Sequence, residues 1–284
     1  MWIDTHAHLD APELWPEGSS IATPPAWHTA AVAQGVTRCV IPAVARGHWA
    51  RVRELAHGLG HVYALGIHPL YVPNMGEDDV AALDEALQQH AHDPRLVAVG
   101  EIGLDFFVPH LNTPAMRERQ QQVYRAQLQL ARRHQLPVLL HVRHSVDVVL
   151  KHLRELRVAG GIAHAFNGSM VQAQAFIQLG FQLGFGGAMT FDTARRLRAL
   201  ATQLPLSALV LETDAPDIPP QWRYATAAQR AAGQPQGLNT PAELPRIAQV
   251  LADLRSLPLA DVAAHTTANA LTALPRLRQG GEGL

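Results

Sequence analysis

Short apolar runs alternate with longer segments in which apolar residues recur every three or four positions. Runs of four to eight apolar residues are typical of buried strands, and a 3.6-residue period is typical of amphipathic helices. The pattern predicts eight strands, at residues 1–9, 36–41, 62–67, 96–102, 137–142, 161–165, 181–185 and 208–213. Seven of these are followed, after a short connection, by a segment with helical periodicity.

The predicted helices cover residues 28–34, 48–59, 79–90, 113–134, a segment ending near 156, 170–179 and 193–203. After the eighth strand, the proline-rich segment 216–239 is predicted to be irregular. Thr240 and Glu243 then have the spacing of a capping box before an eighth helix, and residues 259–273 form a ninth.

Strands that alternate with helices favour a parallel sheet, and eight such units favour closure. We therefore predict an α/β fold, a single (β/α)8 TIM barrel with an extra C-terminal helix, formed by residues 1–284 as one domain. An open doubly wound sheet is the alternative. It would normally carry a glycine-rich phosphate loop after the first strand, and none follows His8.

Composition and charge narrow the classes of function. The 48% hydrophobic content is that of a globular protein with a large core. With 23 basic and 24 acidic residues, no global attraction to nucleic acid is expected, so a polyanion must be held locally. Cys39, the one cysteine, lies in an apolar run and is predicted to be a buried structural thiol. No signal peptide or membrane span is indicated, so a cytoplasmic location is expected.

The opening stretch carries the first candidate site. In a strand, Asp4, His6 and His8 point to one face, which places two imidazoles side by side at the strand's end. Neutral imidazole is the commonest protein ligand for transition metals. His90 and His92 have the same spacing but follow a helical run, where residues two apart do not share a face, and we interpret them as surface residues.

Five more polar residues follow later strands: His68, Glu101, His141, His164 and Asp214. Singly, each histidine could be a hydrogen-bonded surface residue, and each acid a helix cap. In a closed barrel, however, the carboxyl ends of all strands meet at one rim, where active sites lie. Their joint occurrence at strand ends therefore favours a common functional centre.

Six runs in chain order resemble the TatD family of metal-dependent hydrolases. They are residues 4–9 (DTHAHL), 66–69 (GIHP), 100–105 (GEIGLD), 136–143 (LPVLLHVR), 164–169 (HAFNGS) and 211–216 (LETDAP). The run DAPDIP at 214–219 is most similar to the YjjV-like branch of the family. The resemblance covers nearly the whole chain and implies a TIM barrel with an amidohydrolase-like metal centre.

Carried over by position, the resemblance implies a ligand set for two divalent metal ions. His6, His8 and Asp214 would hold one ion, His141 and His164 the second, and Glu101 would bridge both. Asp214 is the candidate general base, and His68 lies beside the centre as a further candidate catalytic residue. Four imidazoles and two carboxylates suit zinc or manganese better than magnesium, although family resemblance keeps magnesium open.

Candidate substrate contacts are Arg143, Trp222 and Arg223. Arg143 follows His141 by two positions and would meet a phosphate oxygen. Trp222 and Arg223 lie in segment 216–239, where they would stack bases of a frayed strand; the alternative is a loop packed on itself. The sequence departs from the family at Leu70, where many relatives have histidine, and at residues 238–241 (LNTP), where an arginine is frequent.

Three functions remain. The first is a phosphodiesterase of the deoxyribonuclease or exonuclease type that acts on single-stranded nucleic-acid ends with water activated by two metal ions. The second is hydrolysis of a carboxylic ester or amide, such as aminoacyl-tRNA deacylation. The third is a metal-binding protein without activity, which the intact ligand set disfavours. No membrane or obligate protein partner is expected.

Overall fold

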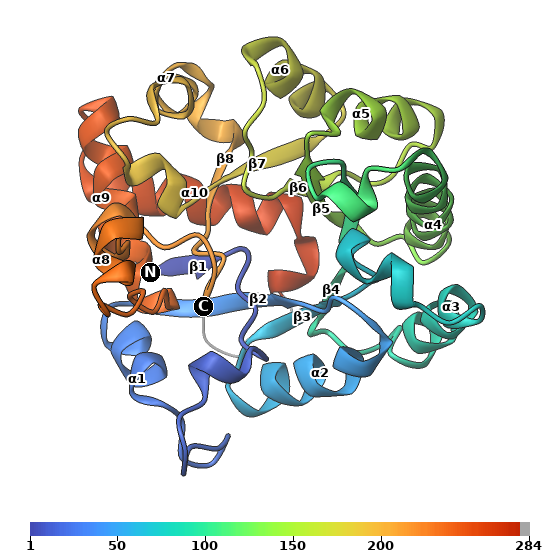
Figure 1. Ribbon diagram of the computed structural model, residues 1–284, viewed down its shortest axis with the longest axis horizontal. Coiled ribbons are helices and arrows are strands. Elements are labelled where there is room, and N and C mark those ends of the chain that lie inside the picture. Colours follow the sequence, from blue (N-terminus) through green and yellow to red (C-terminus); the bar gives the residue numbers. More distant parts are fainter. Residues whose placement is uncertain (279–284) are drawn as a thin grey trace.

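Eight parallel strands form a barrel in the computed structural model, which describes residues 1–278 (Figure 1). Each strand pairs with the next one along the chain, in the order β1 to β8. The strands are β1 Trp2–Asp4, β2 Val36–Pro42, β3 Val62–Leu65, β4 Leu96–Asp105, β5 Val138–Arg143, β6 Gly161–Ala163, β7 Phe181–Phe185 and β8 Leu209–Leu211. The predicted architecture is confirmed, although β1 is shorter and β4 longer than the apolar pattern indicated.

Helices surround the ring of strands (Figure 1). They are α1 Ala26–Ala33, α2 Trp49–Gly58, α3 Asp79–Gln89, α4 Pro114–Arg133, α5 Val146–Glu155, α6 Met170–Gln178, α7 Arg195–Gln203, α8 Ala227–Ala231, α9 Leu244–Arg255 and α10 Leu259–Ala273. The start of α4 has a regular cap, because the Thr113 hydroxyl accepts a hydrogen bond from Met116 N–H and proline occupies the first helical position. None of the helices in residues 1–278 has the length and apolarity needed to cross a bilayer.

Closure of the barrel depends on residues just beyond β1 and β8. Thr5 N–H donates to the Leu211 carbonyl over 3.1 Å, and Asp214 N–H donates to the His6 carbonyl over 2.8 Å. His8 N–H completes the seam with a 2.7 Å bond to the Ala215 carbonyl. The last and first strands are thus joined at the level of the candidate metal ligands.

The extra C-terminal helix α10 and the turn after it close one end of the barrel. Ala270, Leu274 and Leu277 belong to one buried cluster with side chains from the strands, among them Val62 and Val210. This packing removes apolar surface from water at the barrel's amino-terminal end. A larger cluster fills the layer between the strands and the outer helices and includes Cys39, which is buried as predicted.

Two local predictions were wrong in segment 216–243. The proline-rich segment 216–239 is not wholly irregular, because it contains the turn η7 Gln221–Arg223 and helix α8. Thr240 makes no side-chain cap. Glu243 instead accepts hydrogen bonds from Trp222 Nε1 and Arg223 Nε, each over 2.7 Å. These tertiary hydrogen bonds, one of them within an ion pair, replace the local capping box.

Two buried glutamines of α4 hold the backbone next to the candidate site. Gln127 accepts from Ile67 N–H over 2.7 Å and donates to the Ile67 carbonyl over 3.0 Å. Gln120 accepts from Asp105 N–H over 2.9 Å and donates to the carbonyls of Asp105 and Leu111. The two side chains, two helical turns apart, therefore satisfy buried peptide groups where β3 and β4 end.

We expect Gln120→Ala to lower the free energy of unfolding by about 2–3 kcal/mol, because it leaves buried peptide groups without partners. Gln129→Ala on the exposed face of the same helix is the matched control and should change stability by less than about 0.5 kcal/mol. Urea denaturation followed by circular dichroism measures both. Equal stability of the two variants would contradict the role given to Gln120.

Candidate metal centre

The seven candidate residues come from six strands and meet at the carboxyl end of the barrel. His6 and His8 follow β1, His68 follows β3, His164 follows β6 and Asp214 follows β8. Glu101 and His141 lie within β4 and β5, so Glu101 does not end its strand as predicted. A cavity of about 1130 Å³ opens over this group and is lined by His8, His68, Glu101, His141, His164 and Asp214.

Four ligand atoms converge on one point. His6 Nε2 lies 3.3 Å from His8 Nε2 and 3.2 Å from Glu101 Oε2, and His8 Nε2 lies 3.4 Å from the same oxygen. Asp214 Oδ1 lies 3.6 Å from His6 Nε2 and 3.7 Å from His8 Nε2. Ligands about 2.1 Å from a tetrahedral ion are about 3.4 Å from one another.

The chemistry of this group fits a divalent cation. Two imidazole nitrogens that face each other across 3.3 Å repel unless a proton or a cation lies between their lone pairs. The buried Asp214 Oδ1 has no hydrogen-bond partner in residues 1–278. Buried polar atoms without partners are rare and call for a bound group. These donors therefore have the types and spacing that a metal ion requires.

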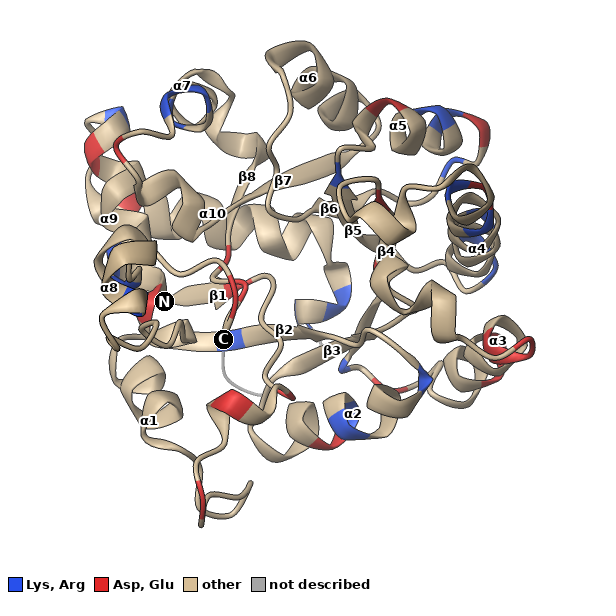
Figure 2. Cartoon of the chain, viewed as in Figure 1, with Lys and Arg blue, Asp and Glu red and all other residues tan. Residues whose placement is uncertain are grey.

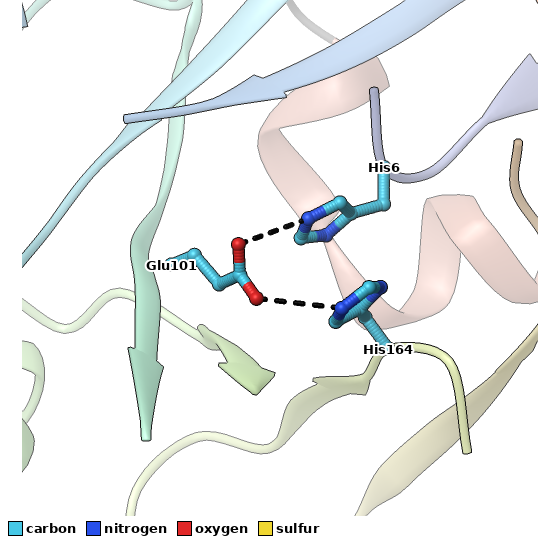
Figure 3. Close-up of side chains that lie close together, drawn as sticks. All are labelled: His6, Glu101 and His164. Carbon is cyan, nitrogen blue, oxygen red and sulfur yellow. Dashed lines mark hydrogen bonds and ion pairs between the residues drawn. The ribbon is translucent and has the colours of Figure 1, made fainter. Parts of the chain in front are cut away.

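The second oxygen of Glu101 faces a second group of imidazoles. Glu101 Oε1 lies 3.1 Å from His141 Nδ1 and 3.4 Å from His164 Nε2. Figure 3 shows the carboxylate between His6 and His164, with one oxygen toward each ring. One carboxylate thus joins both groups, which is the arrangement expected of a bridging ligand.

Two carboxylates that the sequence analysis missed orient these histidines. Asp105 Oδ2 lies 3.1 Å from His141 Nε2, so the N–H of that ring faces Asp105 and its Nδ1 lone pair faces the centre. Glu212 Oε1 lies 3.4 Å from His164 Nδ1 and also accepts from Ala165 N–H. The period of two along each strand was the available signal, because it places Asp105 on the face of Glu101 and Glu212 on that of Asp214.

His68 is held as a hydrogen-bond donor to Glu101. Its Nδ1 accepts from Leu70 N–H over 3.1 Å, so a neutral ring carries its proton on Nε2. That nitrogen lies 3.4 Å from Glu101 Oε1. Although His68, Glu101 and His141 are close enough to hold an ion together, this tautomer places His68 beside the centre.

Electrostatics separate the two acidic ligands. Burial opposes ionisation of Glu101, but His68, His6 and His164 hold the pKa of this carboxyl well below its usual value. Burial raises the pKa of Asp214 to about 7, against the opposing effect of His164 and His8. Without bound cations, neighbouring imidazoles therefore favour the ionised form of Glu101, whereas burial disfavours the ionised form of Asp214.

Close backbone approach also shapes the site. Gly103 has φ 145°, and a Cβ there would lie 2.0 Å from the carbonyl oxygen of His141. Only glycine allows β4 and β5 to pair at this level, where Glu101 meets His141. Asp214 has φ 57°, a left-handed conformation that aspartate adopts more readily than most residues.

The candidate substrate residues divide into two places. Arg143 lines the cavity and lies 4.0 Å from Asp105. Trp222 and Arg223 are bound to Glu243, and neither is among the residues that line the cavity. Their arrangement matches the self-packed loop, and substrate contact by these two residues stays a prediction that the cavity does not support.

The chain was compared with known proteins. The sequence model described as TatD related DNase matches residues 3–275. The Escherichia coli protein named uncharacterized metal-dependent hydrolase YjjV is 36% identical, with 95% of this chain and 96% of that protein covered. Its crystal structure matches with a TM-score of 0.83 over 96% of this chain and 98% of that one, at 35% identity. A Klebsiella pneumoniae protein named 3'-5' ssDNA/RNA exonuclease TatD is 34% identical over 78% of this chain and 79% of its own length.

We expect two divalent ions per chain after removal of metal with a chelator and reloading with manganese or zinc. Glu101→Ala should lower occupancy of both sites, and His141→Ala that of one. His144→Ala, three residues further along, is the control and should keep the wild-type content. Elemental analysis of dialysed, folded protein measures all four. Wild-type content in Glu101→Ala would contradict the bridging assignment.

Asp105→Asn should weaken binding of one ion about 10- to 100-fold, because the amide no longer accepts the His141 N–H as an anion. Competition with a chromogenic chelator gives the two dissociation constants. The second ion serves as the internal control. Unchanged affinity at both sites would show that Asp105 does not orient a ligand.

Proposed function

This chain belongs to the family of TatD-related DNases, and on that basis we propose that it is a phosphodiesterase that hydrolyses single-stranded ends of DNA or RNA. The family and the relatives support a metal-dependent hydrolase acting on ester bonds. The name of the Klebsiella pneumoniae relative supports nucleic acid as the substrate. Exonuclease action is our inference for this chain.

One observation carries the proposal: the donors that Glu101 joins form the floor of an open cavity rather than a closed structural site. Catalytic metal sites keep a position for water or substrate, whereas structural sites are saturated by the protein. Here Glu101 and Asp214 line the cavity together with Arg143. A substrate in the cavity can therefore reach both the candidate metal ligands and the positively charged guanidinium of Arg143.

The chain's own residues have separate roles in this reaction. His6, His8 and Asp214 would hold one ion, and His141 and His164 the other, with Glu101 between them. Two divalent ions, zinc or manganese by ligand type, would supply an activated water and offset negative charge on the phosphoryl group. Asp214 accepts the proton of the attacking water, since its carboxylate lines the cavity and its Oδ1 has no hydrogen-bond partner in residues 1–278.

Two further residues set the surroundings of the reaction. His68 donates to Glu101 and holds the orientation of the bridging carboxylate. The guanidinium of Arg143 is half exposed on the cavity wall, where it binds a phosphate oxygen of the substrate.

Charge favours short single-stranded ends over long duplex as the substrate. The formal net charge is −1, and Figure 2 shows Lys and Arg spread over several outer helices, including α2, α4 and α5. Duplex binding normally requires a basic surface that contacts many phosphates. A strand end that enters a cavity requires few such contacts.

Wild-type protein loaded with manganese, zinc or magnesium should release mononucleotides from single-stranded DNA. Glu101→Ala and Asp214→Asn should lower the rate by at least about 100-fold, because each removes a ligand and Asp214→Asn also removes the base. Separation of products by chromatography measures release, and circular dichroism checks folding.

The competing function is hydrolysis of a carboxylic ester or amide by the same centre. If the metal-loaded protein leaves DNA and RNA intact but deacylates aminoacyl-tRNA or cleaves amide substrates, the nuclease proposal is wrong and the coarser hydrolase assignment stands.

A further inference from the structure

The wall of the cavity is apolar on one side. Among the large apolar side chains that are exposed in residues 1–278, three line the cavity: Leu70, Tyr71 and Phe107, with 41%, 38% and 49% exposure. Leu70 and Tyr71 come from the turn η3 Pro69–Asn74, and Phe107 follows β4. An exposed apolar group at a cavity mouth marks a place where a ligand is in contact.

The opposite wall is polar. Arg196 at the start of α7 donates to the side chain of Asn167 over 2.8 Å, and both residues line the cavity. Asp217, which follows β8, also lines the cavity. The large exposed apolar side chains of the cavity therefore lie near β3 and β4, whereas Arg196 and Asp217 lie near β7 and β8.

Phe107 is held in place by the residues of the metal centre. The Asp105 carboxylate that lies against His141 through Oδ2 also accepts Phe107 N–H over 2.8 Å through Oδ1. Phe106 N–H donates to the Arg143 carbonyl over 2.9 Å. One carboxylate therefore links the Phe107 backbone to a candidate metal ligand, so Phe107 has a defined position relative to the centre.

The ring of Phe107 has one covered side and remains half exposed. The Arg143 guanidinium carbon lies 3.8 Å from the ring centroid, and the His144 ring packs edge to face with it at 5.0 Å. A cation over one face of an aromatic ring stabilises the pair. The exposed part of the Phe107 ring and the planar, positively charged guanidinium of Arg143 thus offer two adjoining flat surfaces.

We propose that Phe107 and Arg143 form a platform on which the nucleobase next to the scissile phosphate stacks. This inference rests on the proposed function and deepens it, because it assigns recognition of the base to one wall of the cavity. Single-strand binders stack bases on aromatic and arginine side chains without reading sequence. The platform accordingly favours unpaired nucleotides, since a base inside a duplex has no free face.

The test compares two ligands that differ only in the base: deoxyadenosine 5'-monophosphate and deoxyribose 5-phosphate. Calorimetry with metal-loaded wild-type protein should give about 5- to 150-fold tighter binding of the nucleotide, the range for one stacked base. Phe107→Ala should bring this ratio close to one, because the base then has no ring to stack on; the ratio cancels any common effect on phosphate binding through Arg143, which packs on Phe107. Phe107→Trp should keep or increase the ratio.

Tyr224→Ala tests a rival platform. Tyr224 is also exposed, with Arg230 over its ring at 5.5 Å and Phe191 edge to face, but it is not among the residues that line the cavity. Loss of the ratio in Tyr224→Ala and not in Phe107→Ala would overturn the inference. A wild-type ratio near one would also overturn it.

The proposed function is tested by a different measurement, the cleavage of single-stranded DNA and RNA. Wild-type protein that leaves single-stranded DNA and RNA intact fails the nuclease proposal, whatever the binding ratio. A nuclease in which Phe107→Ala keeps the wild-type binding ratio leaves the nuclease proposal standing and rejects the platform.

Discussion

The seam between the first and last strands is the constraint on which the rest of the structure depends. Asp4 is fully buried and accepts hydrogen bonds from Thr213 N–H at 2.9 Å and from the Thr213 hydroxyl at 2.5 Å. A buried carboxyl requires such partners, and burial raises the pKa of Asp4 to about 7 in spite of them. Because the seam joins residues more than two hundred positions apart, it brings His6 and His8 next to Asp214.

The buried carboxylate of Glu101 is stabilised by the histidines around it. Glu101 is 1% exposed, and transfer of an isolated carboxylate to such a place is costly. Five histidines surround its two oxygens, and further carboxylates face the outer nitrogens of His141 and His164. From the centre outward, the Glu101 carboxylate is followed by imidazole rings, and two of these rings are followed by the carboxylates of Asp105 and Glu212. This arrangement stabilises bound cations rather than the empty fold, which is typical of a functional site.

The candidate metal ligands and the candidate substrate contacts differ in how firmly the fold holds them. The candidate ligands lie on strands or one to four residues past their ends, where backbone pairing limits their movement. Phe107 follows β4, Arg143 ends β5 and Arg196 lies in the first turn of α7; all three line the cavity, where side chains can vary without disturbing the barrel. Asp105 connects the two groups, because one of its oxygens contacts the candidate ligand His141 and the other accepts the Phe107 N–H.

The alternation of apolar runs and helical periods by itself determined the fold class, because period-two and period-3.6 patterns are local properties of a chain. The gathering of these side chains at one end of the barrel was also readable, since parallel strands place their carboxyl ends together, although Glu101 lies inside β4 rather than at its end. They are His6, His8, Glu101, His141, His164 and Asp214. Tertiary structure alone decided the rest. Whether His68 donates or ligates depends on a backbone contact with Leu70, and whether Trp222 faces the cavity depends on Glu243. Such choices follow from distances across the fold, which no local pattern contains.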